Sequence, residues 1–200
     1  MERNQRIMMR RQKKKKIARM KFFGIMGILI LFIVSIWVRS FSTIEEIAEE
    51  FTEEQTKYAS LSDPLARTDS LDQLNEKTRE AALLFLQIAE DEGLEVVITE
   101  TYRSQERQEY LYTLGRTAEG NVVTWTKNSE HTKRSAFDIA KNVIGEEYSD
   151  RDFFRKAAEI GKRIGLEAGY YWGDGRQDMP HFQMNWYGRV IYPEGYEKEE

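Results

Sequence analysis

The pattern of hydrophobic and polar positions changes character along the chain. An uncharged apolar run fills residues 22–38. An acidic stretch with apolar residues at helical spacing follows over residues 39–73 and is typical of a solvated helical stalk. From there on, amphipathic patterns mix irregularly with short β-branched runs, which predicts a folded domain over residues 74–193. An acidic tail, residues 194–200, ends the chain.

Three helices are predicted in this domain, the first and the third from the helical spacing of their apolar residues. The first ends at Gly93. The second begins after Ser104, whose side chain can cap it, and Gly115 closes it. The third covers about residues 150–164, with its apolar residues on one stripe.

Short runs rich in β-branched and aromatic residues predict the strands. They cover residues 94–101, 121–126, 136–140 and 181–186. Because helices and strands do not alternate regularly, a parallel doubly wound sheet is not expected. The fold class predicted from the pattern is a small α+β domain.

The apolar run at residues 22–38 is long enough for a short membrane span. At about 1.5 Å per residue it reaches roughly 25 Å, and the basic residues on both sides can extend toward the headgroups. Residues 1–21 carry ten basic residues and one acidic residue, so this end is expected to stay in the cytoplasm and the domain to lie outside. A cleaved signal peptide is the alternative, because Ser40 and Ser42 form a small-x-small pair.

Charge and composition limit the expected binding partners of the chain and the residue types that could bind a metal or act as a nucleophile. The basic segment adjoins the apolar run, so attraction to anionic membrane lipid is expected rather than binding of nucleic acid. The chain has no cysteine, which excludes disulfides, thiolate metal sites and a cysteine nucleophile. It has two histidines, so any metal must be held by His, Asp or Glu.

Three polar clusters interrupt the predicted elements of the domain. Their residues of interest are, in chain order, Arg103; Ser129, His131 and Asp138; and Asp178 and His181. Two imidazoles and one carboxylate suit zinc, and three protein ligands leave a fourth position open for water. Hydrolysis at such a site also needs a carboxylate that takes a proton from water, and Asp178 is the nearest candidate. Taken singly, each cluster also has an ordinary structural explanation, such as a turn at Asp178.

Three sequence strings, taken in order, resemble the M15 family of zinc peptidases. They are TYRSQERQEYLYTLGRT at residues 101–117, NSEHTKRSAFDIA at residues 128–140 and DMPHFQM at residues 178–184. The family includes the VanY-type D-alanyl-D-alanine carboxypeptidases and the L-alanyl-D-glutamate endopeptidases of phage lysins. The resemblance runs from roughly Leu74 to Tyr187 and implies a Hedgehog/DD-peptidase-like fold with one catalytic zinc ion.

The resemblance also implies a role for each candidate residue. The implied zinc ligands are His131, Asp138 and His181. Asp178 would be the catalytic carboxylate, and Arg103 would bind substrate and stabilise the transition state. Ser129 would orient the substrate or the metal-binding loop.

The sequence departs from the family at Arg134, where the family usually has glycine three residues after its first histidine. If that turn requires a positive φ, Arg134 is strained there. Either the loop is rebuilt in this chain or the site is weakened.

Together these features predict a membrane-anchored, extracytoplasmic zinc peptidase that acts on peptidoglycan stem peptides. The string that begins at Arg103 resembles more closely the endopeptidases that cut between L-Ala and D-Glu. A D-Ala-D-Ala carboxypeptidase that trims the terminal D-Ala is the alternative. A non-catalytic, zinc-containing wall-binding module is a third possibility, which Arg134 favours and Asp178 opposes.

Overall fold

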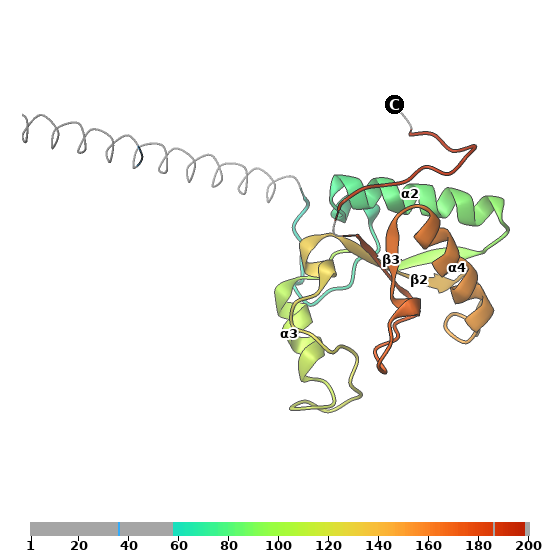
Figure 1. Cartoon of the computed structure of the whole chain (residues 1–200). Helices are drawn as coiled ribbons and strands as arrows, with labels where there is room; N and C mark the ends of the chain where they lie inside the picture. The colour runs from blue at the N-terminus through green and yellow to red at the C-terminus, as the bar shows by residue number, and fades with distance from the viewer. Residues whose placement is uncertain (1–35, 37–57, 186, 199–200) are drawn as a thin grey trace, which may run out of the picture. The chain divides into compact units, whose positions relative to one another are not determined.

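The computed structural model describes residue 36, residues 58–185 and residues 187–198 (Figure 1). The predicted basic segment, nearly all of the apolar run and most of the stalk lie outside these residues. Within the described part of the chain, no helix is long and apolar enough to cross a membrane. The residues from Tyr58 onward form one compact unit.

One four-stranded antiparallel sheet organises this unit. Its strands, in spatial order, are β1 (Val96–Glu100), β2 (Ala136–Lys141), β4 (His181–Met184) and β3 (Leu166–Ala168). In the register of the sheet, Asp138 on β2 lies opposite Glu100 on one side and His181 on the other. Three polar residues therefore form one row across the sheet. This arrangement confirms the predicted α+β class.

Two helices pack together on the sheet, α2 (Glu76–Asp91) and α4 (Arg151–Arg163) (Figure 1). Successive residues of a strand point to opposite faces, so Phe137 and Phe182 point away from Asp138 and His181 and into the core. Their rings stack with centroids 5.6 Å apart, and Phe85 of α2 packs on Phe182 at 4.9 Å. The core thus lies directly behind the polar row.

The third helix, α3 (Gln105–Thr113), follows β1. Its predicted cap is confirmed, because the Ser104 side chain accepts a hydrogen bond from the Arg107 N–H. The other helices are capped in the same manner by Asn75 and Asp150. Short 3₁₀ turns complete the unit: η1 (Leu71–Gln73), η2 (Glu130–Lys133) and η3 (Gly169–Tyr171).

Two predictions about strands were wrong. Residues 121–126 form a loop, because no strand pairs with them; the Gln108 side chain instead donates to the Thr124 hydroxyl and the Thr126 carbonyl. Strand β3 was not predicted, since three residues are too few to show a period of two. The first and last predicted strands are present but shorter than expected.

Contacts of the folded unit also extend beyond residues 74 and 193, the boundaries predicted for the domain. Tyr58 is buried, and the Thr101 N–H donates to the Thr68 carbonyl, so residues 58–73 pack against the domain as part of it. At the other end, the Tyr196 hydroxyl donates to Asp91, and Lys198 pairs with Glu80 at 3.2 Å. These contacts could not be predicted from the sequence, because both segments are rich in polar and acidic residues.

Adjacent leucines on α2 offer a matched test of this packing. Leu84 is 4% exposed, whereas Leu83 is 42% exposed. We expect Leu84→Ala to lower the free energy of unfolding by about 2–5 kcal/mol, because it leaves a cavity in the core. Leu83→Ala should cost about 1 kcal/mol or less. Denaturant unfolding of the chain, followed by tryptophan fluorescence, measures both losses of stability; equal losses would contradict the burial of Leu84.

Candidate metal centre

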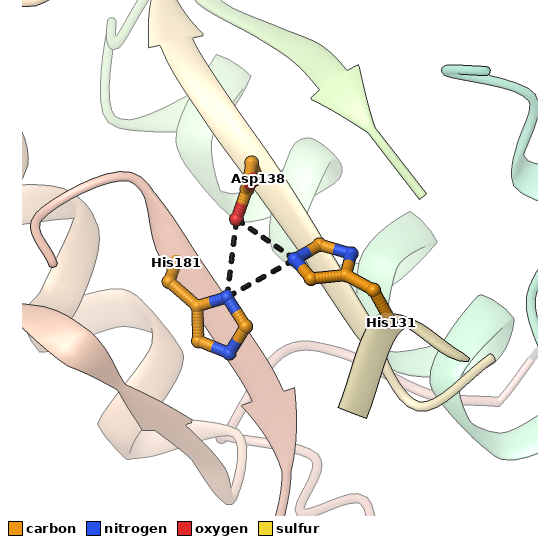
Figure 2. A group of neighbouring side chains, drawn as sticks. All are labelled: His131, Asp138 and His181. Carbon is orange, nitrogen blue, oxygen red and sulfur yellow. Dashed lines mark hydrogen bonds and ion pairs between the residues drawn. The ribbon is translucent and has the colours of Figure 1, made fainter. Parts of the chain in front are cut away.

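Three side chains from different elements converge at one end of the polar row. His131 comes from η2, Asp138 from β2 and His181 from β4, and they point toward one another (Figure 2). The three facing atoms are His131 Nε2, His181 Nδ1 and Asp138 Oδ1, and each pair of them is 3.1 Å apart. His131 is 1% exposed and His181 is 6% exposed. The structure therefore brings together the three residues that the sequence suggested as metal ligands.

Hydrogen bonds on the far side of each ring fix its orientation. His131 Nδ1 lies 2.6 Å from the Thr101 carbonyl, which can only accept, so this nitrogen donates. His181 Nε2 donates in the same way to Gln183 Oε1 at 3.1 Å, because the Gln183 amide nitrogen is committed to Glu167. The nitrogens that face Asp138 are therefore the ones free to hold a metal, and this arrangement is the usual support for metal-bound histidines.

The donor set fits zinc. Tetrahedral zinc holds nitrogen and oxygen ligands at about 2.0–2.1 Å, which places neighbouring ligand atoms about 3.3 Å apart. The observed separations of 3.1 Å are close to this value. Two imidazoles with one carboxylate are also a ligand set typical of catalytic zinc.

The electrostatics of the cluster favour positive charge at the same point. Desolvation opposes ionisation of Asp138, but the two neighbouring imidazoles outweigh it and hold its pKa well below the usual range. For His181, desolvation favours the neutral ring, yet the carboxylates of Asp138 and Asp178 outweigh it and raise the pKa. A field that favours a proton on His181 also favours a cation between the three ligands.

Asp178 lies beside this centre at the rim of a pocket. The residue is exposed, but the pocket walls desolvate its carboxyl group and the charge of Asp138 opposes its ionisation; together they raise its pKa despite the histidines and Arg103. Its backbone N–H donates to the Gly169 carbonyl at 3.0 Å. A Cβ at residue 169 would lie 2.4 Å from the Asp178 carbonyl oxygen, so this close approach requires glycine.

Arg103 is buried behind Asp138 and is held by other side chains. Its Nε and Nη2 donate to the two carboxylate oxygens of Glu100 at 3.0 and 2.7 Å, and its Nη1 donates to Gln108 at 2.7 Å. Nη2 also lies 3.7 Å from Asp138 Oδ2. Desolvation of Glu100 is outweighed by Arg103 and Arg107, so the pKa of Glu100 is lowered and the pair stays charged.

Ser129 is buried at the start of the metal-binding loop. Its hydroxyl accepts a hydrogen bond from the His131 N–H at 3.3 Å, and its carbonyl accepts one from the Thr132 hydroxyl at 2.8 Å. These contacts are those of a residue that orients the loop, which is one of the two roles suggested for it.

The centre opens into a pocket of about 1210 Å³. One wall carries Asp178 and Trp172, and Arg103 lies beside the metal centre. Apolar residues of α3 and the loop after it also line the pocket; they are Leu111, Leu114, Val122, Val123 and Trp125. The pocket therefore combines the polar groups of the metal centre with apolar lining residues.

Comparison with known proteins identifies the family. A family model of VanY D-alanyl-D-alanine carboxypeptidases matches residues 71–186, more than half of the chain. The chain belongs to the VanY family. The predicted membership of the M15 peptidases is thereby confirmed, and zinc is the metal of this family.

The chain is similar to one named relative and to two solved structures. The chain is 35% identical over 108 residues to the peptidoglycan L-alanyl-D-glutamate endopeptidase CwlK of Bacillus subtilis (strain 168); the match covers 48% of this chain and 64% of CwlK, just under two thirds. Among solved structures, the L-Ala D-Glu endopeptidase ChiX of Serratia marcescens has a TM-score of 0.48 at 22% identity, covering 64% of this chain and 97% of ChiX. The LdcB LD-carboxypeptidase has a TM-score of 0.44 at 16% identity, covering 56% and 58%.

Several supporting residues of this VanY-family site were not predicted from the sequence. They are Glu100, Gln108, Glu167, Gly169 and Gln183. Gln183 could have been found, because it follows His181 by two residues in a strand and so shares its face. Gln108 and Glu100 gave no such signal. Both hydrogen-bond to the buried Arg103 side chain, which lies beside Asp138, and the sequence does not reveal these contacts.

Gln183 provides a test of the metal centre from outside the ligand set. We expect Gln183→Leu to weaken zinc binding by about tenfold to a hundredfold, because His181 loses the partner that orients it. The matched control is Gln177→Leu, since the Gln177 side chain donates to the Tyr170 carbonyl instead of contacting a histidine. Chelator competition on the full-length chain measures both affinities. An unchanged affinity in Gln183→Leu would contradict this orienting role.

Proposed function

We propose that the chain is a zinc peptidase that hydrolyses peptidoglycan stem peptides, most readily the bond between L-Ala and D-Glu. The observation that carries this proposal is the triangle of His131, Asp138 and His181, with both imidazoles buried, beside Asp178 in an open pocket. Membership of the VanY family supports the reaction class.

The proposed roles follow from the chemistry of these groups. Held by His131, Asp138 and His181, zinc would supply a Lewis acid that acidifies a water molecule and polarises the scissile carbonyl. Asp178 accepts the proton from that water on its carboxylate and then passes it to the leaving amine. Its raised pKa suits this work, because a weaker acid is a better proton acceptor and can still return the proton.

Arg103 serves the site in two ways in this proposal. Glu100 and Gln108 engage three of its five N–H groups, which fixes the plane of the guanidinium beside Asp138. The remaining N–H groups are available to a carboxylate or to a carbonyl oxygen of the substrate at the pocket wall. Ser129 holds the His131 loop in place for the same reaction.

The endopeptidase is favoured over the carboxypeptidase by the named relative. CwlK, at 35% identity, is an L-alanyl-D-glutamate endopeptidase. The D-Ala-D-Ala carboxypeptidase remains the second candidate, because the matching family model carries that description. A non-catalytic, zinc-containing wall-binding module is less favoured, since a binding module has no use for the Asp178 carboxylate beside the metal centre.

The proposal includes a location for the enzyme. Residues 22–38 would form a single membrane span, with residues 1–21 in the cytoplasm near anionic lipid and the peptidase domain on the extracytoplasmic side. The uncharged apolar run and the ten basic residues before it support this topology. The substrate and the membrane lipid are then the expected partners, and nucleic acid is not.

The bond that is cut can be identified directly. The full-length chain, purified in detergent and loaded with zinc, is incubated with purified muropeptides, and mass spectrometry identifies the products. We expect cleavage between L-Ala and D-Glu. Loss of the terminal D-Ala alone would replace the endopeptidase by the carboxypeptidase. Zinc-loaded protein that leaves every muropeptide intact would favour the wall-binding module. The His131→Ala chain, which should lose both zinc and activity, is the negative control.

A matched pair of acidic residues tests the proton acceptor. We expect Asp178→Asn to keep its zinc and to lose at least about a hundredfold in kcat, because the amide cannot accept the proton. Asp174→Asn is the control: Asp174 lies in the same loop, is exposed, and has a positive φ that asparagine tolerates. Near-normal turnover in Asp178→Asn would remove Asp178 from the mechanism.

A further inference from the structure

Arg134 occupies the turn between two of the three ligands of the metal centre. It ends η2, which carries His131, and the chain enters β2, which carries Asp138, directly after it. Its φ of 60° and ψ of 23° are left-handed, a conformation that is uncommon for residues other than glycine. Its N–H donates to the His131 carbonyl at 3.1 Å. The conformation of this one residue therefore sets how His131 and Asp138 lie relative to each other.

The Arg134 side chain is held between two aromatic rings. Its guanidinium carbon lies 3.9 Å from the centre of the Tyr58 ring and 3.7 Å from that of Tyr102. Both distances are within the range of cation–π attraction, which strengthens when the cation is partly desolvated. Nη1 also donates to the Gln73 backbone carbonyl at 2.8 Å and to the Gln73 side-chain carbonyl at 2.6 Å. We call this group of Tyr58, Tyr102, Gln73 and Arg134 the arginine clasp.

The arginine clasp joins segments that are far apart in the sequence. The Gln73 side chain donates to the Ala59 carbonyl at 2.8 Å, which fastens the segment around Tyr58. The Arg134 carbonyl accepts from the Asn75 N–H at 3.0 Å, which fastens the start of α2. Tyr102 directly follows Thr101, whose carbonyl orients the His131 ring. The clasp is thus connected to the metal-binding loop through both its backbone and its rings.

We propose that Arg134 is a positioning residue for the metal centre, and that the arginine clasp, including Tyr58, holds the left-handed turn that separates His131 from Asp138. A glycine at this position would need no support, because glycine adopts this conformation without strain. In this chain the contacts of the side chain offset the strain of the backbone. Tyr58 lies before residue 71, where the family match begins, so this support comes from outside the shared domain.

The direction in which a substitution changes stability and zinc affinity distinguishes this proposal from an arginine that is merely tolerated. If the Arg134 side chain did nothing, replacement by glycine would only relieve strain and would raise the melting temperature. If the clasp holds the turn, the same replacement removes three anchors at once. The loop then samples other conformations, and the affinity for zinc falls. Asparagine makes the cleaner variant, because it tolerates the left-handed region without the added backbone freedom of glycine.

The experiment measures metal binding by the full-length chain in detergent, at a temperature where every variant is folded. We expect Arg134→Asn and Tyr58→Leu each to weaken zinc binding about tenfold, as loss of a supporting contact does. Both should alter the visible absorption of the Co²⁺-loaded protein, which reports the geometry of the ligands. Tyr58→Phe keeps the ring and should restore both properties. The control is Arg116→Asn, which removes another arginine–tyrosine stack, with Tyr112 at 4.1 Å.

Two results would overturn the proposal. One is unchanged zinc affinity and Co²⁺ absorption in Arg134→Asn and Tyr58→Leu, even with a lower melting temperature, since the clasp would then serve stability alone. The other is an equal loss in Arg116→Asn or in Tyr58→Phe. The proposal rests on the proposed zinc centre but not on turnover: a chain that binds zinc and cleaves no stem peptide would fail as a peptidase and still decide the role of Arg134.

Discussion

The partly buried carboxylate of Asp138 is the constraint on which the rest of the site depends. A charge in this position, in the middle of a sheet, is tolerated only where opposite charge or hydrogen-bond donors surround it. Its neighbour on β1, Glu100, takes the shortest contacts of Arg103 and Arg107, and Arg103 lies farther from Asp138, at 3.7 Å. The closest partners of the Asp138 carboxylate are the two imidazoles. Hydrogen bonds on the far side of each ring turn its other nitrogen toward Asp138, which leaves a place for a cation between the three side chains.

The alternation of residues along β2 and β4 places this carboxylate and the hydrophobic core on opposite faces of the sheet. Alternation along β2 and β4 places Asp138 and His181 on one face and Phe137 and Phe182 on the other, so a single peptide step separates the metal centre from the hydrophobic core. Packing of α2 on these phenylalanines fixes the backbone of both ligands. The same rigidity is what a catalytic constellation requires, because a small displacement of a ligand changes the geometry of the metal.

The sequence predicted the parts of this arrangement that have a local cause. Amphipathic spacing located α2 and α4, and the Ser104 cap and Gly115 located α3. The resemblance to M15 peptidases named the three converging ligands. The failures have a shared physical reason: strand pairing and burial of polar side chains depend on partners distant in the chain. Residues 121–126 had strand-forming composition but no neighbour to pair with, whereas Tyr58 and Gln73 sat in a polar stretch and yet pack against the domain.

The position of Tyr58 shows that the described residues before the family match are part of the folded unit. The segment from Tyr58 to Ser70 does not simply lead to the domain, because its backbone bonds to Thr101 at Thr68 and Ser70, and Arg107 donates to the Leu65 carbonyl. Thr101 and Arg107 both belong to the network around the metal centre, through His131 and Glu100 respectively. A polar segment with few apolar residues is thus held by hydrogen bonds to residues that the site itself requires. Cutting the chain at the start of the family match would therefore remove part of the support of the metal centre along with the linker.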